Sequence, residues 1–121
     1  MSKILIVDDS PAQLHKLRKI VEEGGHQTVI ADSGEAAIEL AADENPELIL
    51  MDIVMPGMSG YQATRKLHRD ETTRHIPVIL VSSKDGEADR AWGLRQGARE
   101  YVTKPVNART LLDAISHTIA A

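Results

Sequence analysis

The stretch LILMDIVMPGMSG (residues 48–60) joins a wholly apolar run to an aspartate and then to a turn built around proline and glycine. Four apolar residues in a row predict a strand that is covered on both faces, as strands of parallel sheets are. Such a strand has no structural use for a carboxylate at its end, because an isolated buried charge is strongly unfavourable or takes up a proton. We therefore interpret Asp52 as part of a functional site.

Short apolar runs recur along the chain, and two of the others, ILIV at 4–7 and VILV at 78–81, are also apolar at every position. Each run has the length of a strand buried between two layers of helices. The expected strands are 4–7, 28–31, 48–51, 78–81 and 101–103.

Helical patterns fill the intervals between these runs. Ser10 followed by Pro11 is typical of a helix start, and the pair Gly24-Gly25 stops that helix. Asp32 with Glu35 is interpreted as the capping box of a second helix, which ends before the Asn-Pro pair at 45–46. The remaining helices are expected at about 60–70, at about 85–96 and from 107 onward.

Five strands alternating with five helices predict a doubly wound α/β sandwich, in which right-handed crossovers place helices on both faces of one parallel sheet. The chain has 121 residues, and its 42% hydrophobic and 26% charged residues are ordinary for a folded globular protein. We expect residues 1–121 to form a single domain.

Charge and composition exclude several classes of function. The net charge of -4 argues against a nucleic-acid partner, which requires clustered Lys and Arg. No apolar window is long enough to insert into a membrane, and no signal peptide begins the chain. Cysteine is absent, so disulfide and thiolate chemistry are excluded, in keeping with a cytoplasmic protein.

Polar residues follow the expected strands at one edge of the sheet, where ligands of open parallel sheets bind. Asp8 and Asp9 follow the first strand and Asp52 follows the third. Ser82 ends the fourth strand, and Lys104 follows the fifth. Three carboxylates, a hydroxyl and an amine should therefore meet at one rim.

This set of side chains favours phosphoryl chemistry. One lysine cannot neutralise three carboxylates, and oxygen ligands without His or Cys suit Mg²⁺. A lysine and a hydroxyl are natural partners of phosphoryl oxygens, which makes Asp52 the candidate nucleophile. Asp8 and Asp9 could alternatively have the purely structural role of capping the first helix, but Ser10 already supplies a cap.

The pair Asp8-Asp9, the run MDIVMPGMSG, Ser82 and the pair Lys104-Pro105 together resemble the receiver domain of two-component response regulators, from end to end of the chain. The resemblance implies a CheY-like, flavodoxin-like sheet in the order 2-1-3-4-5 and a cis Lys104-Pro105 bond. It implies that Asp52 accepts a phosphoryl group from a sensor histidine kinase, CheA-like, or from its phosphotransfer domain.

The resemblance also implies the roles of the other site residues. Asp8, Asp9, Asp52 and the backbone carbonyl of Val54 would hold Mg²⁺. Lys104 would contact the phosphoryl group, which Ser82 would turn inward to hydrogen-bond, and Tyr101 would change rotamer in response.

Two aromatic residues remain open to more than one interpretation. A tyrosine on a short terminal strand is more often a packing residue with a wet hydroxyl than a switch, and Tyr101 is weighed against that alternative. Trp92 is either a core anchor or an exposed partner contact, and we expect it to be partly exposed. The expected output surface combines the fourth helix, the fifth strand and the fifth helix.

Two longer stretches, MDIVMPGMSGYQATR and RAWGLRQGAREYVTKPV, resemble the PilH-type regulators of twitching (type IV pilus) chemosensory systems. With no output region after Ala121, we expect the chain to act by protein contact, with no enzymatic output, or as a phosphate sink for a chemotaxis-type kinase. The alternatives are an aspartyl-phosphate hydrolase, whose DxD pattern the first strand lacks, and a flavodoxin-like cofactor binder, whose phosphate loop is missing.

Overall fold

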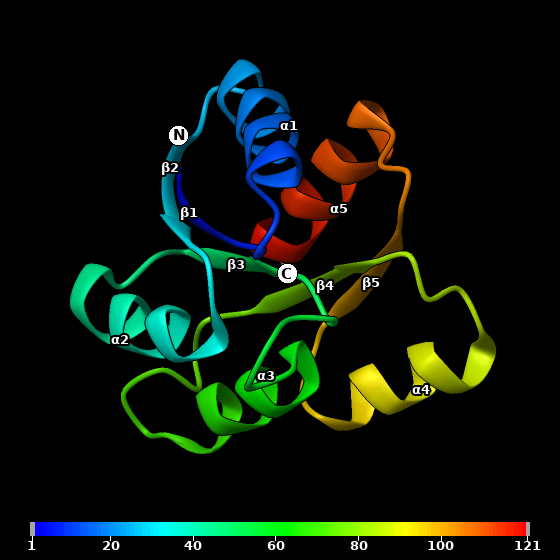
Figure 1. Ribbon diagram of the computed structural model, residues 1–121. Helices are drawn as coiled ribbons and strands as arrows, with labels where there is room; N and C mark the ends of the chain where they lie inside the picture. Colours follow the sequence, from blue (N-terminus) through cyan, green and yellow to red (C-terminus); the bar gives the residue numbers. More distant parts are fainter. Residues whose placement is uncertain (1, 121) are drawn as a thin grey trace.

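Each of the five apolar runs forms a strand of one parallel sheet in the computed structural model, which describes residues 2–120. The sheet order is β2-β1-β3-β4-β5, as the family resemblance implied (Figure 1). The strands are β1 (Lys3–Val7), β2 (Gln27–Ala31), β3 (Leu48–Met51), β4 (Val78–Ser82) and β5 (Glu100–Thr103).

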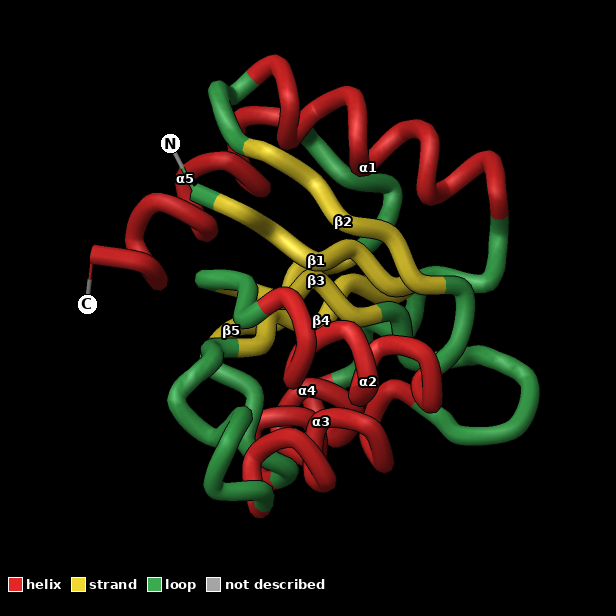
Figure 2. Tube along the Cα trace, turned by 90° about the vertical axis from the view of Figure 1, so that its left-hand side faces the viewer, coloured by secondary structure: helices red, strands yellow, loops and turns green. Residues whose placement is uncertain are grey.

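Helices cover both faces of this sheet, which confirms the doubly wound sandwich. Helices α1 and α5 lie on one face and α2, α3 and α4 on the other (Figures 1 and 2). Within residues 2–120, no helix combines the length and the apolar character that a membrane crossing requires. The helices are α1 (Pro11–Glu23), α2 (Gly34–Glu44), α3 (Gly60–Arg69), α4 (Glu87–Arg95) and α5 (Ala108–Ala120).

The two layers explain why the central strands are apolar at every position. In β1, Ile4 and Ile6 pack into the cluster that contains residues of α1 and α5. The alternate residues Leu5 and Val7 pack into the cluster on the α2 and α3 side. Successive side chains of a strand point to opposite faces, so a sheet with two covered faces needs apolar residues at both parities.

The starts of the helices agree with the sequence except at α2 and α4. The Ser10 hydroxyl caps α1 as expected, by accepting from the backbone N–H of Gln13. The proposed capping box of Asp32 and Glu35 is wrong, because the cap of α2 is Ser33, whose hydroxyl accepts from Ala36 N–H. Both Asp and Ser are favourable N-cap residues, but only Ser33 directly precedes the first residue of the helix. Helix α4 begins two residues later than expected.

Candidate functional site

Asp8, Asp9 and Asp52 meet at the carboxyl edge of the sheet. Strands β1 and β3 are neighbours with Val7 opposite Met51, so the residues that follow them lie side by side. One carboxylate oxygen from each aspartate lies within 4.8 Å of the other two. Asp8 and Asp52 are buried, whereas Asp9 is exposed. The sequence pattern therefore placed these three side chains correctly in one cluster.

Lys104 joins this cluster from the end of β5, at the same edge of the sheet. Its Nζ donates to Asp8 Oδ2 at 2.9 Å and to Asp52 Oδ1 at 3.3 Å. The peptide bond from Lys104 to Pro105 is cis, which confirms the expectation drawn from the resemblance. One ammonium group thus lies between two buried carboxylates.

The charges at this site do not balance. Burial and the nearby Asp8 carboxylate raise the pKa of Asp52 above its ordinary value, and Lys104 only partly offsets them. Burial alone would lower the pKa of Lys104, but its ion pairs with Asp8 and Asp52 prevail and raise it. The lysine is therefore fully charged at neutral pH, and an excess of negative charge remains for a second cation.

The donor set fits a hard divalent cation. All three acidic side chains offer oxygen atoms, and neither His nor Cys takes part in the cluster. The exposure of Asp9 leaves one side of the cluster open to water, which suits Mg²⁺ because this ion keeps several water ligands. The fourth expected ligand, the carbonyl of Val54, belongs to the adjoining loop, where the Val54 side chain is 61% exposed.

Replacing Asp9 with Ala should abolish Mg²⁺ binding measured by isothermal titration calorimetry. The free energy of unfolding without metal should stay level or rise, because the change removes like-charge repulsion and leaves both Lys104 ion pairs intact. Asp43, an exposed carboxylate of α2, provides the control substitution to Ala. A loss of more than about 1 kcal/mol without metal would instead identify Asp9 as a structural cap.

Gly60 is a site residue that the sequence reasoning used only as a helix start. A Cβ atom at Gly60 would lie 2.0 Å from the backbone oxygen of Asp52, a separation that no side chain tolerates. The Gly60 N–H also donates to the Ile53 carbonyl at 2.8 Å. Because Gly60 has no side chain, α3 begins directly against the backbone of Asp52 and fixes the loop around it.

The hydroxyls of Ser82 and Tyr101 hold the loop between β4 and α4. Ser82 is buried, and its Oγ accepts from the Lys84 N–H at 3.1 Å. Tyr101 is also buried, and its hydroxyl donates to the Lys84 carbonyl at 2.6 Å, so the hydroxyl has a protein partner. Trp92 on α4 is 47% exposed, which confirms the expected partial exposure.

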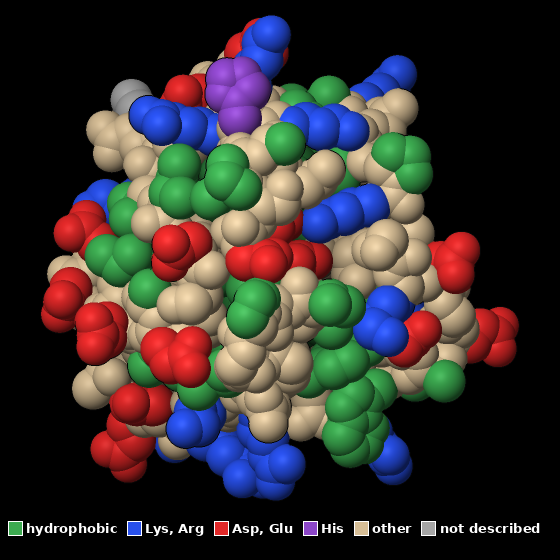
Figure 3. Space-filling model, in the orientation of Figure 1, with side chains coloured by type: hydrophobic (Ala, Val, Ile, Leu, Met, Phe, Trp, Pro, Cys, Tyr) green, Lys and Arg blue, Asp and Glu red, His purple; other side chains and the backbone are tan. Residues whose placement is uncertain are grey.

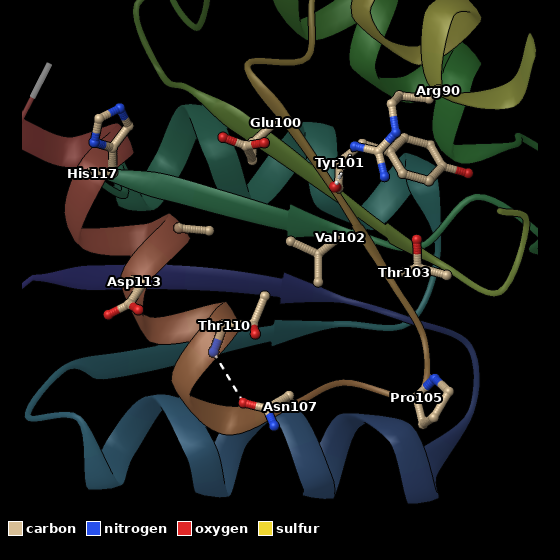
Figure 4. Close-up of a pocket in the computed structure, with 11 residues that line it drawn as sticks. Arg90, Glu100, Tyr101, Val102, Thr103, Pro105, Asn107, Thr110, Asp113 and His117 are labelled. Carbon is tan, nitrogen blue, oxygen red and sulfur yellow. Dashed lines mark hydrogen bonds between the residues drawn. The ribbon is translucent and has the colours of Figure 1, made fainter. Parts of the chain in front are cut away.

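Arg90 is a further residue at this position that the sequence did not reveal. Its guanidinium carbon lies 5.1 Å from the centre of the Tyr101 ring, and its Nη1 donates to the Tyr101 carbonyl at 3.1 Å (Figure 4). A cation over an aromatic face is attracted to the ring electrons. Arg90 therefore ties α4 to β5 over the inward-facing tyrosine.

Comparisons with known proteins agree with this geometry. Residues 4–116 match the family described as the response regulator receiver domain. The protein PilH of Pseudomonas aeruginosa is 52% identical over 120 residues, which cover 99% of each chain. A CheY-like receiver domain protein from Methanospirillum hungatei JF-1 has a TM-score of 0.90 at 31% identity, over 99% of this chain and 94% of that one. The receiver domain of a sensor histidine kinase from Pseudomonas aeruginosa PAO1, with a magnesium ion coordinated in its active-site cleft, has a TM-score of 0.92 at 27% identity, over 99% of this chain and 98% of that one.

Proposed function

Because the chain belongs to the response regulator receiver domain family, we propose that residues 1–121 form one receiver domain that is phosphorylated on Asp52 and thereby changes its protein contacts. The observation that supports this most directly is the Lys104 amine between the buried carboxylates of Asp8 and Asp52, with Asp9 beside them. The phosphoryl donor would be a phosphohistidine of a CheA-like sensor kinase or of its phosphotransfer domain.

The chemistry at Asp52 is a phosphoryl transfer between two nucleophiles. A carboxylate oxygen of Asp52 forms a bond to phosphorus while the bond from phosphorus to the donor imidazole nitrogen breaks, and the imidazole retains that electron pair. The Lys104 ammonium, which lies within hydrogen-bond distance of Asp52, would neutralise a phosphoryl oxygen. Bound Mg²⁺, held by Asp8, Asp9, Asp52 and the Val54 carbonyl, would neutralise the remaining charge.

The response to phosphorylation would begin at the loop between β4 and α4. Ser82 lies at the end of β4, and its hydroxyl can exchange the Lys84 N–H for a phosphoryl oxygen. The same Lys84 residue holds the Tyr101 hydroxyl through its carbonyl, so a change at Ser82 reaches Tyr101 through one residue. Packed side chains shift between discrete arrangements, and α4 would move with them.

The groove beside Tyr101 is the proposed output surface. A cavity of about 670 Å³ lies between β5 and α5, with Arg90 of α4 at one end (Figure 4). Its lining includes Glu100 and Asp113, so a partner would meet both a cation and carboxylates. A rotamer change of Tyr101 would alter this surface directly, because Tyr101 itself lines it.

Replacing Ser82 with Ala should blunt the change in Trp92 fluorescence that beryllofluoride and Mg²⁺ produce, while phosphorylation of Asp52 remains possible. The variant lacks the hydroxyl that would transmit the signal but keeps the nucleophile and Lys104. Ser83→Ala, at the exposed neighbouring residue, is the matched control and should respond like the unmodified protein. If Trp92 stays silent in the unmodified protein while amide shifts concentrate on α1, the output surface lies elsewhere.

The similarity to PilH supports a role in twitching chemosensory signalling in the cytoplasm, through protein contact or as a phosphate sink for the kinase. Transfer of label from a phosphorylated CheA-like kinase, followed by mapping of the label to Asp52, tests the proposal. Rapid loss of label with no change in partner binding would favour the sink. Multiple turnover of small phosphate esters would contradict a switch and indicate a hydrolase.

A further inference from the structure

A second groove, of about 410 Å³, lies between α3 and α4. Its lining residues from α3 lie in the second half of that helix, and those from α4 lie in its second half as well. Helices of this fold begin near the carboxyl ends of the strands and run back towards the amino ends. The second halves of α3 and α4 therefore lie away from Asp52, which follows the carboxyl end of β3. The groove is therefore separate from the phosphorylation site. Its lining residues are Arg65, His68, Arg69, Trp92, Arg95 and Gln96.

Unneutralised positive charge distinguishes the groove. No carboxylate lines it, and Arg65, Arg69 and Arg95 make no ion pair among residues 2–120. The charged residues of α2 are all acidic, although the chain as a whole has a net charge of -4. Figure 3 shows Lys and Arg side chains gathered below, over α3, and acidic side chains gathered at the side, over α2. On this face the cations over α3 are thus separate from the carboxylates of α2.

Favourable interactions within the helices account for only part of this arrangement. Arg69 and Arg95 lie in the last turns of α3 and α4, where cations interact favourably with the helix dipole. The interaction with the helix dipole does not require that carboxylates be absent from the groove, so it does not explain why these arginines are unpaired. It also gives no reason for the aromatic and amide side chains that share the groove.

Trp92 and Gln96 add an aromatic side chain and an amide to the groove. Trp92 lines the groove with 47% of its surface exposed, although Trp is usually well buried. Gln96 lines the groove as well, and its side-chain amide makes no hydrogen bond with any residue among 2–120. Because this amide is open to the groove, it is free to bond to a ligand there. An aromatic anchor beside unpaired arginines is typical of protein-binding sites.

We propose that the α3–α4 groove binds an acidic segment of a partner protein. Carboxylates of that segment would pair with Arg65, Arg69 and Arg95, an apolar side chain would pack on Trp92, and a polar group would meet the Gln96 amide. A protein segment fits better than nucleic acid, because a long polyanion would extend beyond these arginines onto a chain whose net charge is negative.

This site does not depend on the chemistry proposed for Asp52. All of its side chains are in place without a phosphoryl group, and none of them touches the carboxylate cluster. The binding experiment can therefore be carried out on the unphosphorylated protein and repeated with Asp52→Asn. Equal binding by both proteins is expected, whatever the outcome of the phosphorylation tests.

The probe is a fluorescein-labelled helical peptide in which glutamates recur at four-residue spacing beside leucines, and its binding is measured by anisotropy. Trp92 is the single tryptophan, so its intrinsic fluorescence reports occupancy of the groove with unlabelled peptide. The triple variant Arg65→Gln, Arg69→Gln, Arg95→Gln should raise the Kd at least about tenfold, because each exposed ion pair contributes a few-fold. Binding should also weaken as salt is added.

The matched control carries Lys16→Gln, Lys19→Gln and Arg109→Gln, three exposed cations outside the groove that give the same net charge. It should change the Kd less than about threefold. Circular dichroism verifies that both variants are folded. Equal weakening by the two triple variants, or binding without a Trp92 response, would overturn the site. Tighter binding of a single-stranded oligonucleotide or of phosphatidylserine vesicles would overturn the assignment to an acidic protein segment.

Discussion

Asp52→Asn is expected to lower phosphoryl incorporation from acetyl phosphate by more than about 100-fold, because an amide is not a nucleophile at neutral pH. The substitution keeps the size of the side chain and an oxygen that can accept from Lys104, whose Nζ lies 3.3 Å from Asp52 Oδ1. The loss should therefore reflect chemistry alone. Phosphate incorporation and peptide mapping of the acid-labile, base-labile product measure it.

The same variant should be at least as stable as the unmodified protein. Burial and Asp8 raise the pKa of Asp52, so its ionised form costs stability once the pH exceeds 3.8, the ordinary value for an unfolded aspartate. Removing that charge should therefore add up to about 1 kcal/mol at pH 7, and the gain should vanish below about pH 4. Asp43→Asn, on the exposed surface of α2, is the control for both measurements. Continued phosphorylation of Asp52→Asn, or mapping of phosphate to another residue, would refute the assignment.

The sheet and the acidic cluster could be read from the sequence because they rest on local patterns. Runs such as LILM and VILV are apolar at every position, so the side chains on both faces of the strand are apolar. Only a sheet covered on two faces requires this. Once the strands are placed in a parallel sheet, the residues that come after them must lie at one edge. The position of Asp8 and Asp52 at that edge is predicted in this way. The adjacency of β1 and β3, however, came from the resemblance to receiver domains.

Features set by tertiary contact could not be read in this way. Ser33 rather than Asp32 caps α2 because of the exact residue at which the helix begins, and sequence patterns define helix ends poorly. Gly60 looks like an ordinary helix start until the Asp52 backbone is placed against it. Arg90 meets Tyr101, eleven residues away, only after α4 has docked on β5. The α3–α4 groove likewise combines residues of two helices that no motif connects.

The largest effect on stability is expected from Lys104→Met, which keeps most of the side-chain stem and removes the ammonium group. Lys104 Nζ lies 2.9 Å from Asp8 and 3.3 Å from Asp52, and both carboxylates are buried. Removing one partner of a buried ion pair leaves the other charge unpaired and commonly costs about 3–5 kcal/mol. We expect a loss of about 2–4 kcal/mol at pH 8, measured by urea denaturation, because Asp9 leaves the cluster partly open to water.

The dependence of that loss on pH and on metal separates charge from packing. Lys104 remains charged below its raised pKa, so the change at this site between pH 4 and pH 8 is in the charge of Asp52. Without Lys104 the pKa of Asp52 in the folded protein rises further, so the variant loses stability as the pH rises from about 4 through that value. The loss should therefore be small near pH 4 and largest at pH 8.

Millimolar Mg²⁺ at pH 8 should restore more stability to Lys104→Met than to the unmodified protein, because the ion replaces the missing positive charge. Lys16→Met, on the exposed surface of α1, should change stability by less than about 0.5 kcal/mol under all of these conditions. A loss that is constant with pH and insensitive to Mg²⁺ would mean that the lysine stem, rather than its charge, stabilises the site.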